Sequence, residues 1–318
     1  MSSNHRVTTY AGIEIGGTKL QIRVEDEEGN LLHQFKLVNP PSTRAEELRN
    51  IICERMMVLQ QTFNIAATGV GFGGPVDRQN GNIFQSFHVP GWTNFEFQSW
   101  FDAWSIAAVF IENDANVAAL GEALRGAGKG FDKIFYVTLG SGVGSGFVAN
   151  GILYQGFPVE MEFGHLKLDR SGTEVEDVCS GWAINKAILN HVSSDRTGVL
   201  ASLVKKDPGH ESRHLPEAMR KKDAAALEIF DNAMHALSFG LSHVVHLLGP
   251  DTIVIGGGLS LIGTTITDAI TKRFGILLMD VFKPGPVLQI AALGEDAVPV
   301  GAIEFAKQHV AAIKFQNS

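Results

Sequence analysis

The sequence contains little cysteine, no long apolar run and no concentration of positive charge. Only two of its 318 residues are cysteines, Cys53 and Cys179, which excludes a disulfide framework and favours a reducing compartment. No run of 18 apolar residues is present, and residues 1–10 lack a signal-peptide pattern, so we expect a cytoplasmic protein with no membrane partner. The formal charge is −8 and no Lys/Arg cluster occurs, so we expect no nucleic-acid partner.

Apolar residues and glycine are, by contrast, plentiful. Apolar residues make up 45% of the chain, enough for sizeable cores, and its length predicts two domains. Many of the 35 glycines gather in short runs beside predicted strands. Three of these runs directly follow a strand: Gly16-Gly17-Thr18, Gly140-Ser141-Gly142 and Gly256-Gly257-Gly258.

Such glycine turns are suited to binding phosphate. Glycine lets backbone N–H groups approach an anion without a Cβ clash, and consecutive N–H groups form a concave anion site. None of the three runs is a Walker loop, since no Gly-Lys-Ser/Thr precedes a helix, and none matches the dinucleotide-binding fingerprint. A single glycine-rich turn is usually only a structural turn between two strands. Two such hairpins together with a strand-to-helix turn indicate phosphate binding.

The pattern of strands and turns occurs twice, which predicts an internal duplication. In each half a strand, a glycine turn, a second strand, another turn and a third strand follow in order. The predicted strands are 10–15, 20–24 and 31–37 in the first half and 133–139, 145–149 and 152–154 in the second. Further strands are expected at 67–72, 106–111, 252–255 and 287–293. Helices are expected at 45–63, 95–104, 117–124, 181–191, 197–204, 224–248, 260–274 and 299–313.

Helix ends carry two further predictions. Ser42 or Thr43 is expected to cap the helix that begins near Ala45, because hydroxyl side chains are good N-caps. The helix over residues 224–248 is long and is a candidate for a break at Gly240.

Three polar residues stand where a predicted strand ends and a helix begins. Residues 112–116 read Glu-Asn-Asp-Ala-Asn, after the apolar run 106–111 and before the helical pattern of 117–124. In open α/β folds this is where ligands bind, and a carboxylate such as Asp114 can act there as general base for a bound hydroxyl. The alternative is a helix cap, because Asp and Asn are favoured at that position.

The motifs of the whole chain, taken in order, resemble the ROK family of sugar kinases and repressors. The resemblance rests on residues 12–19, 73–77, 112–116 with 120–122, 139–146, 162–165 and 255–258. It implies an α/β protein with the actin-like ATPase (ribonuclease H-like) fold, in which two duplicated lobes surround a cleft for nucleotide and sugar. The implied lobes are residues 1–116, completed by the C-terminal helix 299–318, and residues 117–298. It also implies transfer of the γ-phosphoryl group of ATP to a hexose hydroxyl.

The resemblance assigns roles to individual residues. Asp114 would be the general base. The sugar would be held by Gly74, Asn113, Asp114, Glu162, His165 and Glu176. ATP and its phosphates would be held by Gly16, Gly17, Thr18, Lys19, Thr138, Gly140, Gly142, Gly256 and Gly257. On spacing alone, Glu162 and His165 could instead be a solvated surface pair.

Two departures from the family pattern affect the expected metals. Glu14 stands where the family usually has Asp, so Mg²⁺ would meet an oxygen ligand that is one methylene longer. Many members hold a structural Zn²⁺ with the His of the Glu-x-Gly-His motif and a following Cys cluster. Here only Cys179 lies in that region, and we expect a core residue and no zinc site. Glu176 aligns with the glutamate that ends the cluster, and His165 must be oriented by another group.

We therefore expect an ATP- and Mg²⁺-dependent kinase that converts glucose to glucose 6-phosphate and, by resemblance, forms a homodimer. N-acetylmannosamine, N-acetylglucosamine and fructose stay open as acceptors, and polyphosphate stays open as donor, because the cysteine-poor pattern also resembles the family's polyphosphate-dependent glucokinases. A sugar-responsive regulator is the alternative from another class. Family repressors carry a helix-turn-helix before the first glycine motif, for which the residues ahead of Gly12 leave no room. A sugar-binding protein without kinase activity is a third reading, based on Glu14.

Overall fold

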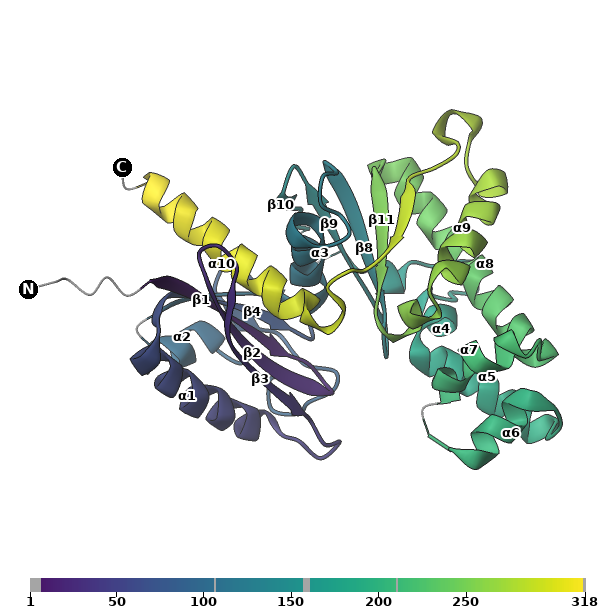
Figure 1. The fold of residues 1–318 in the computed structure, drawn as a ribbon, viewed down its shortest axis with the longest axis horizontal. Coiled ribbons are helices and arrows are strands. Elements are labelled where there is room, and N and C mark those ends of the chain that lie inside the picture. Colours follow the sequence, from purple (N-terminus) through teal and green to yellow (C-terminus); the bar gives the residue numbers. More distant parts are fainter. Residues whose placement is uncertain (1–6, 106, 157–160, 210, 317–318) are drawn as a thin grey trace, which may run out of the picture. The chain divides into compact units, whose positions relative to one another are not determined.

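The computed structural model describes residues 7–105, 107–156, 161–209 and 211–316 (Figure 1). It is a mixed α/β structure with two five-stranded sheets, of order β3-β2-β1-β4-β7 and β10-β9-β8-β11-β12. When the five strands of each sheet are numbered from one to five along the chain, both sheets have the same spatial order, 3-2-1-4-5. The duplication predicted from the turn pattern is therefore confirmed in the topology.

The first sheet places the residues of the opening glycine motif. It contains β1 (Thr8–Ile15), β2 (Lys19–Asp26), β3 (Leu31–Val38), β4 (Asn64–Phe72) and β7 (Ala108–Asn113). β1, β2 and β3 form an antiparallel meander, whereas β4 and β7 run parallel to β1. A small hairpin of β5 (Val76–Asp77) and β6 (Asn82–Ile83) follows β4. The carboxyl ends of the three parallel strands thus carry Ile15, Phe72 and Asn113, and polar motifs follow each of them.

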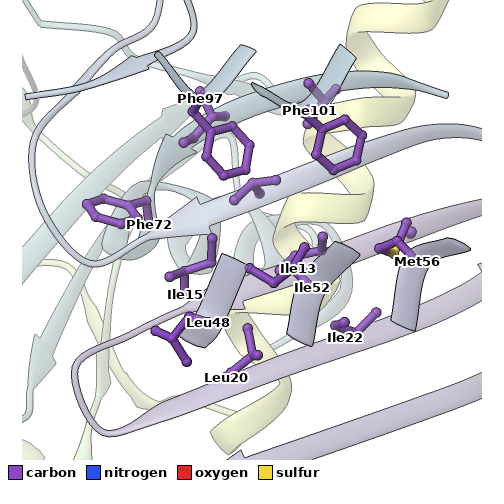
Figure 2. Close-up of a cluster of buried hydrophobic side chains, with 14 of the residues drawn as sticks. Ile13, Ile15, Leu20, Ile22, Leu48, Ile52, Met56, Phe72, Phe97 and Phe101 are labelled. Atoms are coloured by element: carbon purple, nitrogen blue, oxygen red, sulfur yellow. The ribbon is translucent and has the colours of Figure 1, made fainter. Parts of the chain in front are cut away.

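One face of this sheet is covered by α1 (Ala45–Thr62) and α2 (Phe97–Asp102). Figure 2 shows side chains of α1, such as Leu48, Ile52 and Met56, over Ile13 and Ile22 of the sheet. The predicted cap of α1 by Ser42 or Thr43 is wrong. The N-cap is Arg44, without a side-chain hydrogen bond. A carbonyl from a distant loop supplies the missing partner, because the Ala45 N–H donates to Pro90 O at 3.1 Å.

The opposite face is covered by α3 (Asp114–Arg125) and α10 (Ala297–Gln316), which pack on each other. In Figure 1, α10 is the yellow helix that runs beside β1 and β4. Glycine makes this packing possible, because a Cβ at Gly69 would collide with the carbonyl of Ala302 and one at Gly301 with that of Val117. Backbone thus lies directly on backbone beneath the start of α3.

The second sheet contains β8 (Lys133–Leu139), β9 (Val143–Ala149), β10 (Ile152–Leu153), β11 (Thr252–Gly256) and β12 (Val287–Ile290). Asn150 and Gly151 both have positive φ in the turn between β9 and β10, as a tight hairpin requires. The helices of this half are α4 (Glu176–Cys179), α5 (Gly181–Ser194), α6 (Gly198–Lys206), α7 (Leu215–Arg220), α8 (Ala224–Leu248) and α9 (Thr264–Leu277).

α8 is continuous, so the suggested break at Gly240 does not occur. The glycine serves packing instead. A Cβ there would lie 3.0 Å from Val175 and 3.1 Å from the ring of Phe163. The helix keeps its backbone hydrogen bonds, and the missing side chain lets the segment that carries Glu162 and His165 pack on it.

The chain forms two compact units. One comprises Met1–Gly130, Gly146–Met161 and Glu295–Ser318, and the other comprises Phe131–Ser145 and Glu162–Gly294. The lobes expected at 1–116 with 299–318 and at 117–298 stay a prediction. Among the described residues, no helix is long and apolar enough to cross a lipid bilayer.

Candidate active site

In the first unit, the candidate base and the helix cap are two different residues. β7 ends at Asn113 and α3 begins at Asp114. Asn113 is the N-cap, since its Oδ1 accepts from the N–H groups of Ala115 at 2.9 Å and Asn116 at 3.2 Å. Asp114 is half-buried in the first turn, where the positive end of the helix dipole favours a carboxylate. The capping alternative therefore applies to Asn113, while Asp114 Oδ1 accepts a hydrogen bond from the Ala115 N–H at 2.8 Å.

A buried carboxyl, Glu112, and a partly buried guanidinium, Arg78, lie next to this turn. Glu112 is fully buried and accepts from the backbone N–H of Asn113 at 2.8 Å and from Asn116 Nδ2 at 3.1 Å. Arg78 Nη1 lies 3.5 Å from Glu112 Oε2, and Arg78 also donates to the carbonyl of Gly156. Burial raises the pKa of Glu112, although the hydrogen bonds and Arg78 oppose the shift. Sequence reasoning gave neither residue a role, and Arg78 carries no local signal of one.

Gly74 lies beside Asn113, and its predicted place in a sugar pocket stays a prediction. Its carbonyl accepts a hydrogen bond from Asn113 Nδ2 at 3.4 Å. The backbone has φ +156°, and a Cβ would lie 2.5 Å from the carbonyl oxygen of Gln85. A side chain is therefore excluded at this point, which holds the chain close to the end of β7.

Glu14 is buried at the end of β1 and faces two partners from β2. Its Oε1 lies 3.1 Å from Lys19 Nζ, and its Oε2 accepts from Gln21 Nε2 at 2.7 Å. Burial raises the pKa of Glu14 to about 7, with a smaller contribution from the negative charge of Asp114, while Lys19 and Gln21 oppose the rise. Glu14 and Asp114 therefore share one electrostatic environment within this unit.

The first glycine turn is held by residues that sequence reasoning missed. Gly16 N–H donates to Lys19 O at 2.9 Å, which closes the turn. Asn39 holds it from the side, because its Nδ2 donates to Gly16 O at 2.9 Å and its N–H donates to Thr18 O at 2.8 Å. A Cβ on Gly17 would lie 2.6 Å from His88 Cβ, so His88 lies directly against the turn. No sequence signal places Asn39 or His88 at this turn, except that His88 is a single histidine in an aromatic loop.

In the second unit, Glu176 is joined to the second glycine turn. Gly140 N–H donates to Gly142 O at 3.0 Å. The next N–H, of Val143, donates to Glu176 Oε2 at 2.7 Å. A Cβ on Gly142 would collide with that same carboxylate. Thr138 is the penultimate residue of β8, two positions before Gly140. The structure thus joins Glu176, predicted to bind sugar, to the turn predicted to bind phosphate, and both roles stay predictions.

Glu162, His165 and Glu176 form one charged cluster. Glu162 is accessible to solvent, yet enough protein surrounds its carboxyl for desolvation to raise its pKa; the charge of Glu176 adds to the rise and His165 opposes it. The pKa of His165 is also raised, chiefly by its hydrogen bond to Glu174, with smaller contributions from Glu162 and Glu176. The three predicted sugar ligands of this unit therefore lie within electrostatic reach of one another.

The third glycine turn follows β11 and lies against β8. A Cβ on Gly256 would collide with the hydroxyl end of Tyr136, and one on Gly257 would lie 2.5 Å from the backbone of Leu139. Gly257 also has φ +81°, which a side chain would strain. Packing thus accounts for both glycines, and their contact with adenosine stays a prediction.

The residues around His165 do not fit a structural zinc site. No group of three or more His, Cys, Asp or Glu side chains able to hold a metal occurs among the described residues. The Nδ1 of His165 is engaged by Glu174 at 2.7 Å. Cys179 is buried, its Sγ donates to Ala233 O at 3.3 Å, and burial raises its pKa to about 12. A cysteine binds zinc as the thiolate, which burial disfavours at Cys179, so this cysteine is a core residue.

Comparison with known families places the chain. The model of the ROK family matches residues 10–309. The chain belongs to the ROK family. The actin-like ATPase fold expected from the sequence motifs is confirmed by this match and by the solved ROK structures that resemble the chain.

Two ROK relatives and one solved structure span nearly the whole chain. A glucokinase from Streptomyces coelicolor is 31% identical over 310 residues, covering 93% of this chain and 97% of the relative. A glucokinase from Thermotoga maritima is 28% identical over 308 residues, covering 94% and 97%. The structure of a ROK family glucokinase from Streptomyces griseus in complex with glucose and AMPPNP aligns with TM-score 0.80 and 31% identity, covering 94% of this chain and 99% of that one.

Proposed function

We propose that this ROK protein is an ATP-dependent sugar kinase whose acceptor is glucose and whose product is glucose 6-phosphate. The glucokinase relatives, which match over almost the full chain, support the reaction class. The observation that carries the proposal is that the N-cap of α3 and the candidate base are two different residues. Asn113 caps the helix, so the half-buried Asp114 carboxylate need not serve as the cap.

Asp114 would act as general base. An ionised carboxylate within hydrogen-bond reach of the accepting hydroxyl removes its proton as the phosphoryl group arrives. Its place at the N-terminus of α3 favours the ionised form. Glu112 and Arg78 would support it indirectly, because their contacts hold Asn113 and Asn116 on either side.

The sugar would be held by carboxylates, an amide and a histidine. Sugar hydroxyls donate and accept hydrogen bonds, so side chains of both kinds are needed to orient them. The residues proposed for this role are Gly74, Asn113, Glu162, His165 and Glu176. Orientation of the acceptor hydroxyl is worth much of the rate enhancement in phosphoryl transfer, because the protein does little covalent chemistry.

The donor would be ATP, bound by the three glycine turns. Gly16, Gly17, Thr18 and Lys19 would contact the terminal phosphates, and Thr138, Gly140 and Gly142 would form the second phosphate turn, with Gly256 and Gly257 beside adenosine. Mg²⁺, when bound with the nucleotide, supplies positive charge that offsets the phosphate oxygens. Glu14 would hold it, since Mg²⁺ is usually bound by one or two carboxylates together with substrate phosphates.

The alternative functions predict different results in an activity assay. A kinase for N-acetylmannosamine, N-acetylglucosamine or fructose has the same machinery with another acceptor, and a polyphosphate-dependent enzyme has another donor. A sugar-responsive regulator, or a sugar-binding protein without kinase activity, turns over none of them. We also infer a homodimer, which light scattering of the purified protein tests directly.

A coupled ADP-release assay over a panel of hexoses tests the proposal. With ATP and Mg²⁺, glucose should give the highest kcat/KM, and the product should be glucose 6-phosphate. A parallel measurement with polyphosphate, in which glucose 6-phosphate is detected, compares the donors. A higher kcat/KM with another hexose would overturn glucose as the acceptor. Sugar binding without turnover of any hexose would overturn the kinase assignment.

A further inference from the structure

A short hairpin connects His165 to Glu176 in the second unit. Leu168 N–H donates to Thr173 O at 2.7 Å, and Val175 N–H donates to Leu166 O at 3.1 Å. Its tip is closed by Asp169, whose Oδ1 accepts hydrogen bonds from the residues that follow it: Ser171 Oγ at 2.6 Å, Gly172 N at 2.9 Å and Thr173 N at 3.2 Å. The ends of this hairpin are therefore held next to each other.

The hairpin places the Glu174 carboxylate against His165. Glu174 Oε2 lies 2.7 Å from His165 Nδ1, and Glu174 Oε1 accepts from Lys167 Nζ. The Glu174 backbone is held as well, because its N–H donates to Asp177 Oδ2 at 2.9 Å in the first turn of α4. The Glu174 side chain is 23% exposed, compared with 55% for His165. Both carboxylate oxygens are thus occupied, and the carboxylate has a defined direction.

This contact decides which nitrogen of His165 carries a proton. An ionised carboxylate only accepts hydrogen bonds, so Nδ1 must be the donor toward Glu174. A ligand of this ring would therefore bind the opposite nitrogen, Nε2, and the ring cannot flip without losing the Glu174 contact. Glu162 and Glu176, the other charged groups near His165, add to the rise of its pKa and so favour the imidazolium, in which Nδ1 is again the donor toward Glu174. Histidines at functional sites are commonly oriented in this way by a hydrogen bond to the other ring nitrogen.

We propose that Glu174 is a positioning residue of the sugar site, which holds His165 with Nδ1 protonated and presents Nε2 to a sugar hydroxyl. The identity of the ligand rests on the proposed function; the His165–Glu174 contact does not. Glu174 carries no motif and stands among loop residues, so its role follows only from the hairpin register. The alternative is that Glu174 merely pairs with Lys167 on the surface, where ion pairs contribute little.

Four variants separate these readings. Glu174→Ala removes the contact and should raise the KM for the hexose roughly tenfold or more, the range expected for one hydrogen bond to a charged group, while kcat and the KM for ATP change little. Glu174→Gln keeps an acceptor oxygen and should give an intermediate KM. Lys167→Ala removes the exposed ion pair but leaves the His165–Glu174 contact, so it should raise the hexose KM far less than Glu174→Ala does. Glu217→Gln, in the exposed Glu217–Lys221 pair, is a matched control for loss of a surface charge.

A double-mutant cycle and a spectroscopic measurement complete the test. Adding Glu174→Ala to His165→Ala should raise the hexose KM no further, because the two residues act through one contact. Nitrogen NMR of the full chain without sugar, at a pH where His165 is neutral, should show the Nδ1–H tautomer in the wild type and mixed tautomers in Glu174→Ala.

The inference is overturned if the KM for the hexose is unchanged in Glu174→Ala, or if Lys167→Ala raises it equally. A wild type that phosphorylates no hexose would remove the proposed function but not this measurement. In that case an unaltered His165 tautomer in Glu174→Ala overturns the positioning role, and an altered one supports it.

Discussion

The Nζ of Lys19 lies 3.1 Å from Oε1 of Glu14 at the first glycine turn, yet this ion pair does not keep the carboxyl acidic. Glu14 is only 4% exposed, and the cost of desolvating its charge exceeds the attraction of Lys19 and the hydrogen bond from Gln21. The result is a pKa of about 7. Near neutral pH, and without bound nucleotide, Glu14 is therefore protonated in a substantial part of the molecules.

This pKa predicts a pH-dependent stability. Between about 4.5, the ordinary value, and about 7, the unfolded chain has released the Glu14 proton while the native chain still binds it, so stability falls as pH rises. Glu14→Gln has no carboxyl to titrate, so its stability does not fall for this reason. The free energy of unfolding of the variant minus that of the wild type should therefore increase by up to about 3 kcal/mol between pH 4.5 and 8. Urea unfolding at several pH values measures the difference, with the exposed Glu28→Gln as control. If the difference in free energy of unfolding between the variant and the wild type does not change with pH, the pKa of Glu14 is not raised.

Glu14→Gln should also lower turnover. The amide keeps the size of the side chain but loses the charge that would support Mg²⁺ and the phosphates. Hexose binding, measured by calorimetry in the absence of nucleotide, should stay near the wild-type value. If turnover at saturating Mg²⁺ is unchanged, Glu14 has no part in the reaction.

Asp114→Asn should abolish most activity without unfolding the protein. The variant loses the proton acceptor, and positioned general-base catalysis contributes roughly 10²–10⁴-fold to the rate. Stability should change little because Asn113, not Asp114, caps α3. Asp223→Asn is the matched control, since Asp223 is the N-cap of α8 and should affect stability rather than turnover. Wild-type turnover of Asp114→Asn would require another base.

Gly142→Ala should weaken sugar binding through Glu176. The added methyl group meets the Glu176 carboxylate, which accepts the Val143 N–H, so one of them must move. We expect a higher KM for the hexose and a lower melting temperature. Gly275→Ala in α9 is the control, because nothing lies within 4 Å of its Cβ. It should leave the kinetics unchanged and stabilise the helix by up to about 1 kcal/mol. If Gly142→Ala leaves the KM for the hexose unchanged, as Gly275→Ala should, then Glu176 does not bind the sugar.

The purified protein should contain no stoichiometric zinc. Elemental analysis should find far less than one zinc per chain, and a chelator should leave the melting temperature unchanged, because His165 is held by Glu174 and Cys179 is a buried thiol. One tightly bound zinc per chain would contradict this reading of the region.

The sequence by itself determined the features that depend on local pattern. Alternating apolar residues and glycine corners predicted both meanders, because strand periodicity and turn geometry are properties of neighbouring residues. The order of the motifs likewise predicted the family, and the strand-to-helix junction predicted at residues 112–116 contains the observed boundary between Asn113 and Asp114.

The tertiary structure decided everything that depends on partners distant in the sequence. Pro90, rather than Ser42 or Thr43, satisfies the start of α1, and packing on Phe163 explains Gly240 without a break in α8. The pKa of Glu14 depends on how much protein surrounds it. The partner of His165 lies nine positions later in the sequence and depends on the register of a hairpin. No local pattern encodes burial or register, because both arise only when separate segments pack together.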